Sequence, residues 1–308
     1  MNIINNIKKR KIRYFLFWFS LPAIILYAGF MVIPIISSFG YSFFTGAGLT
    51  PDKFVGFENY IKIFTEFPYK DRFINALGNN FLYYLVITVL QTIGGLTVAI
   101  LVTRKFKGVK FFRRITYLPT TIAILVTGYL FKMLFSQRIG VIDKFLEMLH
   151  LGSFIRPWFG DPDTALYSIA IAATWQWMGI VILLFATGID SISEDVLEAA
   201  SIDGASGWSL TRHIILPLMV PVMRIVFMLS FIGNFTGFDM VFAVEGIDAG
   251  PNFSTDILGT LFYRSSFSAP SLGGWGIGMG STVASLSFLI IGIGLVMIIF
   301  IFKRFEKE

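Results

Sequence analysis

The sequence predicts an all-α membrane protein with six transmembrane helices, and three observations support this fold class. The 308 residues are 55% hydrophobic, with a mean hydropathy of +0.74, and only 14% are charged; a soluble domain has about 25% charged residues. Six apolar segments reach the roughly 20 residues that a helix needs to cross a bilayer. Lys and Arg gather at the ends of these segments, as they do beside membrane helices.

The composition also argues against several classes of function. The absence of cysteine excludes disulfides, thiolate metal sites and a cysteine nucleophile. The two histidines, His150 and His213, do not form a His-x-x-x-His pair, so we expect neither a zinc enzyme nor another metal site. The net charge of +6 could suit nucleic acid, but the basic residues flank apolar segments. We therefore expect contact with membrane lipid and no nucleic-acid partner.

The predicted spans form one domain over residues 14–308, after a basic N-terminal segment, residues 1–13. The first span is longer than the roughly 7–15 apolar residues of a signal-peptide core, so we expect it to be retained. In order, the six spans are Tyr14–Phe44, Ala76–Thr103, Ile115–Ser136, Ala165–Ile189, Leu218–Gly237 and Ser281–Phe302.

Basic residues predict the orientation of the chain. Lys8–Arg13, Arg104–Arg114 and the C-terminal tail share one side of a six-span topology and are rich in Lys and Arg. Both termini are therefore expected in the cytoplasm. The segment Asp190–Pro217 falls on the same side but holds five acidic residues and one arginine. An acidic loop on the cytoplasmic side favours contact with a protein rather than with lipid headgroups.

Local signals predict two short helices in this loop. Ser193 is a favourable N-cap, and the acidic residue Glu194 suits the first turn of a helix. Gly204 is placed to end that helix in a left-handed conformation. A second helix is expected from about Ser206 until Leu216–Pro217, because proline disfavours helix at the residue before it.

The same loop resembles a known family. "EAASIDGAS" followed by "IILPLMVP" is similar to the EAA loop of the membrane subunits of ATP-binding-cassette importers. The resemblance implies the type I importer permease fold, in which this loop is a coupling helix that inserts into a groove of a separate ATPase. It also implies that Glu198 offers its carboxylate to a basic residue there and that Gly204 forms the turn. The matching residues are Glu198, Ala199, Ala200, Asp203, Gly204, Ile214, Leu216 and Pro217.

The resemblance further implies a transport subunit in a bacterial cytoplasmic membrane rather than an enzyme. No cofactor is expected in this chain, because ATP and Mg would be bound by the partner ATPase. The implied partners are a dimer of that ATPase, a second homologous permease subunit and an extracytoplasmic sugar-binding protein.

Four other stretches resemble the carbohydrate-uptake branch, similar to the maltose and glycerol-phosphate permeases. These stretches are "FVGFENY", "YLPTTIA", "NFTGFDMVFAVEGIDAGP" and "LFYRSSFS". The Thr-x-Gly-Gly-Pro part of the third pattern is matched only imperfectly, around Glu245–Gly246 and Ala249–Pro251. This branch implies ATP-driven import of a sugar, most simply an oligosaccharide.

A sugar pathway needs polar groups and aromatic faces, and polar side chains inside spans are costly enough to mark candidates. "TWQWMG" in the fourth span and "SFIGNFTGF" in the fifth hold such groups, and Ser230 and Asn234 lie four residues apart on one helix face. The positions carried over from the maltose-type subunit as the substrate pathway are Gln176, Trp177, Ile180, Ser230, Asn234 and Gly237.

Other interpretations of these polar residues stay open. Ser230 and Asn234 could form interhelical hydrogen bonds, the tryptophans could anchor the spans at the membrane interface, and the partner subunit could do most of the sugar binding. Gln91 is expected to make helix–helix contacts, and Lys132 to reach the headgroups.

Three alternative functions remain. A secondary transporter would need carboxylates inside its spans for ion coupling, and a membrane enzyme would need clustered ionisable groups; the sequence offers neither. An importer of another solute, such as glycerol-phosphate, would need a basic pocket.

Overall fold

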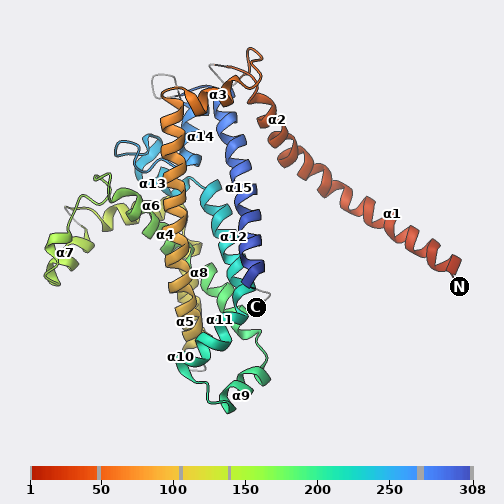
Figure 1. Cartoon of the computed structure of the whole chain (residues 1–308), viewed down its shortest axis with the longest axis vertical. Coiled ribbons are helices and arrows are strands. Elements are labelled where there is room, and N and C mark those ends of the chain that lie inside the picture. The colour runs from red at the N-terminus through yellow and green to blue at the C-terminus, as the bar shows by residue number, and fades with distance from the viewer. Residues whose placement is uncertain (1, 47–49, 104–106, 138–139, 269–273, 306–308) are drawn as a thin grey trace.

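The computed structural model describes residues 2–46, 50–103, 107–137, 140–268 and 274–305, with the backbone alone for residues 2–13, and most of them are helical (Figure 1). The α-helices are α1 (Asn2–Tyr27), α2 (Ile33–Tyr41), α3 (Glu58–Thr65), α4 (Tyr69–Thr103), α5 (Val109–Tyr117), α6 (Ile124–Leu134), α7 (Val141–Met148), α8 (Ala165–Asp190), α9 (Glu194–Ile202), α10 (Gly207–Leu210), α11 (Leu216–Leu218), α12 (Val220–Thr236), α13 (Asp239–Glu245), α14 (Leu258–Phe267) and α15 (Ile277–Phe305).

Within the described residues, four continuous helices are long and apolar enough to cross a membrane. They are Tyr14–Tyr41, which joins α1 to α2 through a π-helical turn, and α4, α8 and α15. Two further pairs of helices pass the same test together but are bent at a short break. If each bent pair is one span, the total reaches six, which is the predicted number.

The third predicted span, Ile115–Ser136, is not one continuous helix. The segment Val109–Thr121 and the helix Ile124–Leu134 meet at an angle of 98°. Pro119 lies in a 3₁₀ turn at the end of the first arm, and Ile122 has extended backbone with ψ near 138°. Proline cannot donate the hydrogen bond that would continue a helix. The helix therefore breaks here, although the sequence on both sides of the break is apolar.

The helix before the fifth span also continues further than predicted. We expected it to end at Leu216–Pro217, but it runs through Pro217 to Leu218 and bends by 66° before α12. Pro217 occupies the first turn of α11, where its missing N–H is tolerated. A wider π-helical turn, Thr211–Ile215, precedes it.

The long helices form a bundle in which α4 and α8 pack along each other and α12 and α15 pack beside them (Figure 1). Helices α3 and α14 lie at the upper end of the bundle in this view, and α5 and α9 lie at its lower end. The N-terminal helix diverges from the bundle, and the apolar part of Tyr14–Tyr41 is unburied.

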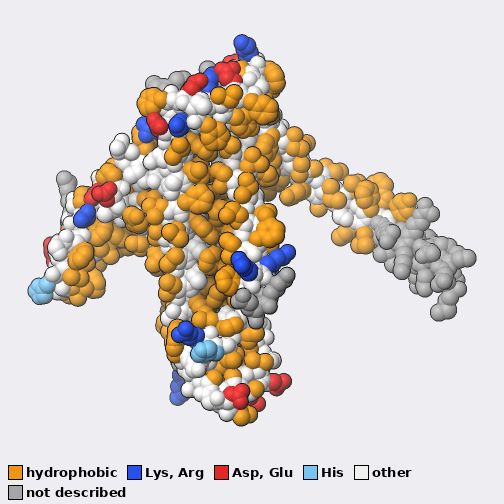
Figure 2. Space-filling model, viewed as in Figure 1, with side chains coloured by type: hydrophobic (Ala, Val, Ile, Leu, Met, Phe, Trp, Pro, Cys, Tyr) orange, Lys and Arg blue, Asp and Glu red, His pale blue; other side chains and the backbone are white. Residues whose placement is uncertain are grey.

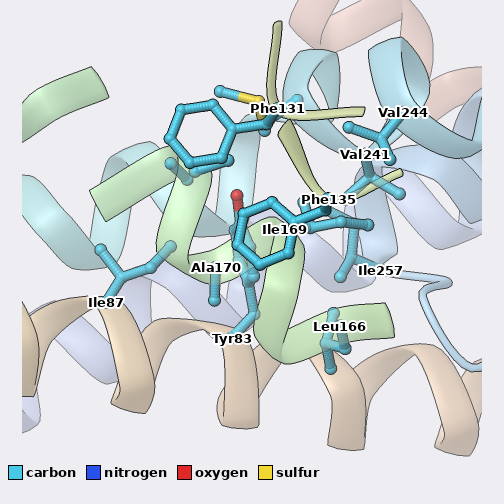
Figure 3. Close-up of a cluster of buried hydrophobic side chains, with 13 residues drawn as sticks. Tyr83, Ile87, Phe131, Phe135, Leu166, Ile169, Ala170, Val241, Val244 and Ile257 are labelled. Atoms are coloured by element: carbon cyan, nitrogen blue, oxygen red, sulfur yellow. The ribbon is translucent and has the colours of Figure 1, made fainter. Parts of the chain in front are cut away.

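A buried apolar cluster fixes the shorter helices on the α4–α8 pair (Figure 3). Tyr83 and Ile87 from α4 meet Ile169 from α8, Phe131 from α6 and Val241 from α13. A Cβ atom added to Gly128 of α6 would lie 2.5 Å from the Cβ of Ala243, which shows how closely α6 and α13 pack. The arm beyond the 98° bend is therefore held against the bundle.

Candidate functional site

A cavity of about 350 Å³ opens between α4, α8 and α12. Its walls are mainly apolar, with a few polar groups from different helices, as expected of a small-molecule site. Five of the six predicted pathway residues line it, namely Trp177, Ile180, Ser230, Asn234 and Gly237. Helical spacing places Ser230 and Asn234 on one face of α12, and Gly237 follows at the end of that helix. The packing of α8 on α12 brings Trp177 and Ile180 to the same cavity.

A hydrogen-bond network holds the polar wall of this cavity. The Asn234 amide Nδ2 donates to the Ser230 carbonyl at 2.8 Å and to its Oγ at 3.0 Å. The Ser230 Oγ also lies 2.8 Å from the Thr88 Oγ1 of α4, and Asn80 Nδ2 donates to the Asn234 carbonyl at 3.0 Å. The interhelical bonding that we left open is therefore present, and it places the same two side chains at the cavity wall.

Gln176, the sixth predicted pathway residue, does not line this cavity. Its side chain is 1% exposed, and its Nε2 donates to the carbonyls of Pro119 at 2.9 Å and Ile122 at 2.8 Å. These two carbonyls flank the break of the third span, where the Pro119 carbonyl also accepts from the Ile122 N–H at 3.2 Å. Gln176 therefore fastens the bend to α8, because buried carbonyls need a donor.

Replacing Gln176 with methionine, which has a similar volume, should destabilise the chain. The Ile122 carbonyl would lose its side-chain donor, at a cost of about 1–3 kcal/mol for a group left unsatisfied, while the Pro119 carbonyl would keep the Ile122 N–H. Thermal unfolding in detergent measures the loss, with Gln137→Met, at an exposed position, as the control. Equal melting temperatures for both variants would show that Gln176 does not hold the bend.

The cavity also contains residues that the sequence did not single out as site residues. Tyr83, Gln91 and Asp239 line it, although we expected Gln91 only to make helix–helix contacts. Asp239 begins α13, directly after the turn at Gly237 that ends α12. A carboxylate just after a span is a signal that could have indicated Asp239 as a site residue. Only the fold shows that Asp239 lines the same cavity as Ser230 and Asn234.

We expected Lys132 to reach the lipid headgroups, but its side chain also makes a contact within the chain. Its Nζ donates to the carbonyl of Val244 at 2.7 Å, at the C-terminal end of α13. A cation is favourable at this end of a helix. Burial raises the pKa of the neighbouring Glu245, and the charge of Lys132 opposes that shift.

The acidic loop has the predicted shape at Gly204. The φ angle of Gly204 is +84°, and two hydrogen bonds close the end of α9. The Ala205 N–H donates to the Ala200 carbonyl at 2.9 Å, and the Gly204 N–H donates to the Ser201 carbonyl at 3.1 Å. This is the Schellman arrangement, in which a left-handed glycine ends a helix.

The residues carried over to the coupling loop divide into exposed and inward-facing groups. Glu198, Ala199 and Asp203 are exposed, whereas Ala200 is buried. The loop forms the lower tip of the molecule, where Figure 2 shows acidic side chains. Leu216 and Pro217 lie apart from this surface, at the entrance to α12.

A buried ion pair organises the opposite end of the bundle, between α13 and α14. The side chains of Asp256 and Arg264 are 0% and 5% exposed and are paired. Thr260 Oγ1 donates to Asp256 Oδ1 at 2.7 Å, and Arg264 Nη1 donates to the Ile247 carbonyl at 3.1 Å. Burial raises the pKa of Asp256, and the Arg264 guanidinium opposes this shift.

Comparison with known families identifies the family of this chain. Residues 91–306 match the family model described as binding-protein-dependent transport system inner membrane component. The chain belongs to this family. It is therefore a multi-pass membrane component of a binding-protein-dependent transport system.

Individual relatives match over nearly the whole chain. The multiple sugar-binding transport system permease protein MsmF of Streptococcus mutans is 30% identical over 301 residues, which are 97% of this chain and 99% of the relative. The trehalose/maltose transport system permease protein MalF of Thermococcus litoralis is 28% identical over 274 residues, 88% of each chain.

The fold also matches a solved structure. A chain of the bacterial alginate ABC transporter, in complex with an alginate pentasaccharide-bound periplasmic protein, superposes with a TM-score of 0.77 at 20% identity. The match covers 97% of this chain and 98% of that one. The chain therefore has the fold of an importer permease, as the sequence predicted.

Proposed function

We propose that this chain is the transmembrane subunit of an ATP-driven importer of a neutral saccharide. The observation that carries the proposal is the cavity between α4, α8 and α12, in a chain of this family. Trp177 offers an aromatic face, and Gln91, Ser230 and Asn234 offer polar groups, which together suit the C–H faces and hydroxyls of a sugar. The names of the relatives MsmF and MalF support this substrate class.

The charge of the cavity favours a neutral sugar over glycerol-phosphate. Among the described residues that line it, Asp239 is the charged one, and it is negative. A phosphate ligand calls for Arg or Lys, so the expected basic pocket is not provided by this wall. An anionic solute would instead be repelled by Asp239.

The loop 190–217 is the proposed contact with a separate ATPase, which would bind ATP and Mg. Its exposed surface around Glu198 and its distance from the cavity suit a coupling element. A second permease subunit would complete the cavity and supply the other coupling loop, and a sugar-binding protein would deliver the solute at the end that carries α3 and α14. In this proposal both termini would lie in the cytoplasm, and the helices would rock between outward and inward access.

Replacing Asn234 with alanine should weaken uptake without disturbing assembly. The side-chain nitrogen Nδ2 of Asn234 already donates to Ser230. The side-chain oxygen Oδ1 of Asn234 is therefore the group left to accept from a sugar hydroxyl. Loss of one such bond should raise the KM of uptake about tenfold, on the scale of about 1.4 kcal/mol. Thr236→Ala is the matched control, because this hydroxyl bonds to the Ile232 carbonyl of its own helix. Unchanged uptake kinetics in Asn234→Ala would move the sugar site elsewhere.

The function itself is tested by uptake in cells that lack the gene and in cells that express it. A panel of labelled neutral oligosaccharides and glycerol-phosphate would be compared, with and without ATP depletion. We expect saccharide uptake that requires both the chain and ATP. Uptake driven by an ion gradient alone would make the chain a secondary transporter, and glycerol-phosphate uptake alone would contradict the neutral substrate.

A further inference from the structure

A second cavity, of about 340 Å³, lies between α5 and α8 near the lower end of the bundle. It shares no described lining residue with the first cavity. One part of its wall is apolar, with Val102, Ile182, Leu183 and Ala186. The other part carries the side chains of Arg113 and Arg114. A cavity that combines apolar walls with cationic groups suits an amphipathic ligand.

Helix α5 combines basic residues with exposed aromatic residues. Lys110, Arg113 and Arg114 give it charge, while Phe111 and Phe112 are 67% and 50% exposed. Short helices with basic residues and exposed aromatic residues lie in the headgroup region of a bilayer. Lipid at this surface would take these phenylalanines out of water and meet the basic residues with its headgroups.

The two arginines are in different situations. The Arg113 Nε donates to the Val102 carbonyl at 3.1 Å, and its Nη2 donates to Asp190 Oδ2 at 3.2 Å. Within the part of the chain that the structure describes, the Arg114 side chain has no hydrogen bond or ion pair. The cavity therefore presents an exposed guanidinium that has no partner among the described residues. Such a group binds phosphate with two parallel hydrogen bonds.

Close packing fixes the position of these arginines relative to the cavity. A Cβ atom added to Gly179 of α8 would lie 2.5 Å from the Thr116 carbonyl oxygen and 2.8 Å from the Tyr117 Cα. Only a residue without a side chain allows α5 to approach α8 so closely. The guanidinium of Arg114 is thus carried by a helix held against the apolar wall.

We propose that this cavity binds a phospholipid with an anionic headgroup, with Arg114 on the phosphate and the Leu183 side of α8 against an acyl chain. Basic pockets between membrane helices on the cytoplasmic side bind such headgroups. The site rests on the orientation in the proposed function, but not on the substrate or on the coupling role of Glu198. Bound lipid would brace α5, the arm that leads into the 98° bend.

Lipid binding can be measured without transport, so its failure is distinguishable from failure of the proposed function. The full chain, purified with its partner subunits in detergent, would be melted with dioleoyl-phosphatidylglycerol or with dioleoyl-phosphatidylcholine. We expect phosphatidylglycerol to raise the melting temperature more than phosphatidylcholine. Arg114→Gln should lose at least about half of that difference. Lys303→Gln, another exposed basic position at the lower end, should keep it.

Two further arms complete the test. Leu183→Trp, which narrows the cavity and keeps both arginines, should also lose the phosphatidylglycerol effect, and it serves if Arg114→Gln does not fold. Inorganic phosphate at millimolar concentration should not stabilise the complex. An unchanged lipid effect in both variants would overturn the proposal, as would full stabilisation by phosphate alone. Release of the second permease subunit by Arg114→Gln, with the lipid effect intact, would show that protein covers the cavity instead.

Discussion

Replacing Glu198 with lysine should stop coupled transport while leaving the permease folded. Glu198 is exposed on α9, and its side chain makes no hydrogen bond or ion pair with the described residues, so reversing its charge should leave them folded. At the proposed interface it would place a positive charge beside a basic residue of the ATPase. Breaking a charge pair at an interface costs about 2–5 kcal/mol, which weakens binding roughly 30-fold or more.

Co-purification of the ATPase with the permease, followed by uptake in proteoliposomes, measures this effect. Glu147→Lys is the matched control, because Glu147 is an exposed carboxylate on α7, away from the loop. Complexes that carry Glu198→Lys and yet assemble and transport at the wild-type rate would refute the docking role.

Gly204 provides an independent test of the same surface without a change of charge. A valine at φ +84° would be strained by about 1–2 kcal/mol, and the turn after α9 would shift. Gly204→Val should therefore uncouple transport, whereas Gly204→Asn should keep most of it, since asparagine tolerates the left-handed conformation. Equal activity of the two variants would show that the turn is not needed for coupling.

Replacing Asp256 with alanine should produce the largest loss of stability in the chain. The change leaves the Arg264 guanidinium buried without its carboxylate, and breaking a buried ion pair costs about 3–5 kcal/mol. The Arg264 guanidinium carbon also lies 5.0 Å from the centroid of the Phe253 ring, and that of Arg72, from α4, lies 3.3 Å from the same centroid. Loss of the pair should therefore loosen the whole segment between α13 and α14.

Thermal unfolding in detergent measures this loss, with Asp248→Ala, an exposed carboxylate of the same segment, as the control within about 0.5 kcal/mol. The double variant Asp256→Ala with Arg264→Met should recover part of the stability, because no charge is then left buried. A melting temperature for Asp256→Ala equal to that of the control would show that the ion pair contributes nothing.

Features set by neighbouring residues could be predicted from the sequence. Helix α8 begins at Ala165, where its apolar segment begins, because hydropathy determines how a chain crosses lipid. The turn at Gly204 follows from the conformational freedom of one residue. The pairing of Ser230 with Asn234 follows from the spacing of a helix.

Features that depend on distant partners could not be predicted. The break at Ile122 lies inside a continuous apolar segment, and the side chain that donates to the carbonyls on either side of it is Gln176, more than fifty residues along the chain. A polar residue inside a span signals a partner but does not say whether the partner is solute or backbone. For the same reason the sequence did not indicate Asp239 as a cavity residue, because its position depends on how α13 packs on α6.

The near right angle in the third span has a mechanical consequence. Gln176 fastens the corner to α8, one arm runs beside the lower end of α8, and the other arm packs on α13 next to the first cavity. A rigid corner of this kind would convert a displacement of one arm into a displacement of the other arm in a different direction. In the proposed transport cycle, a displacement along the lower arm would become a sideways displacement of the upper arm, which packs on α13 beside the first cavity.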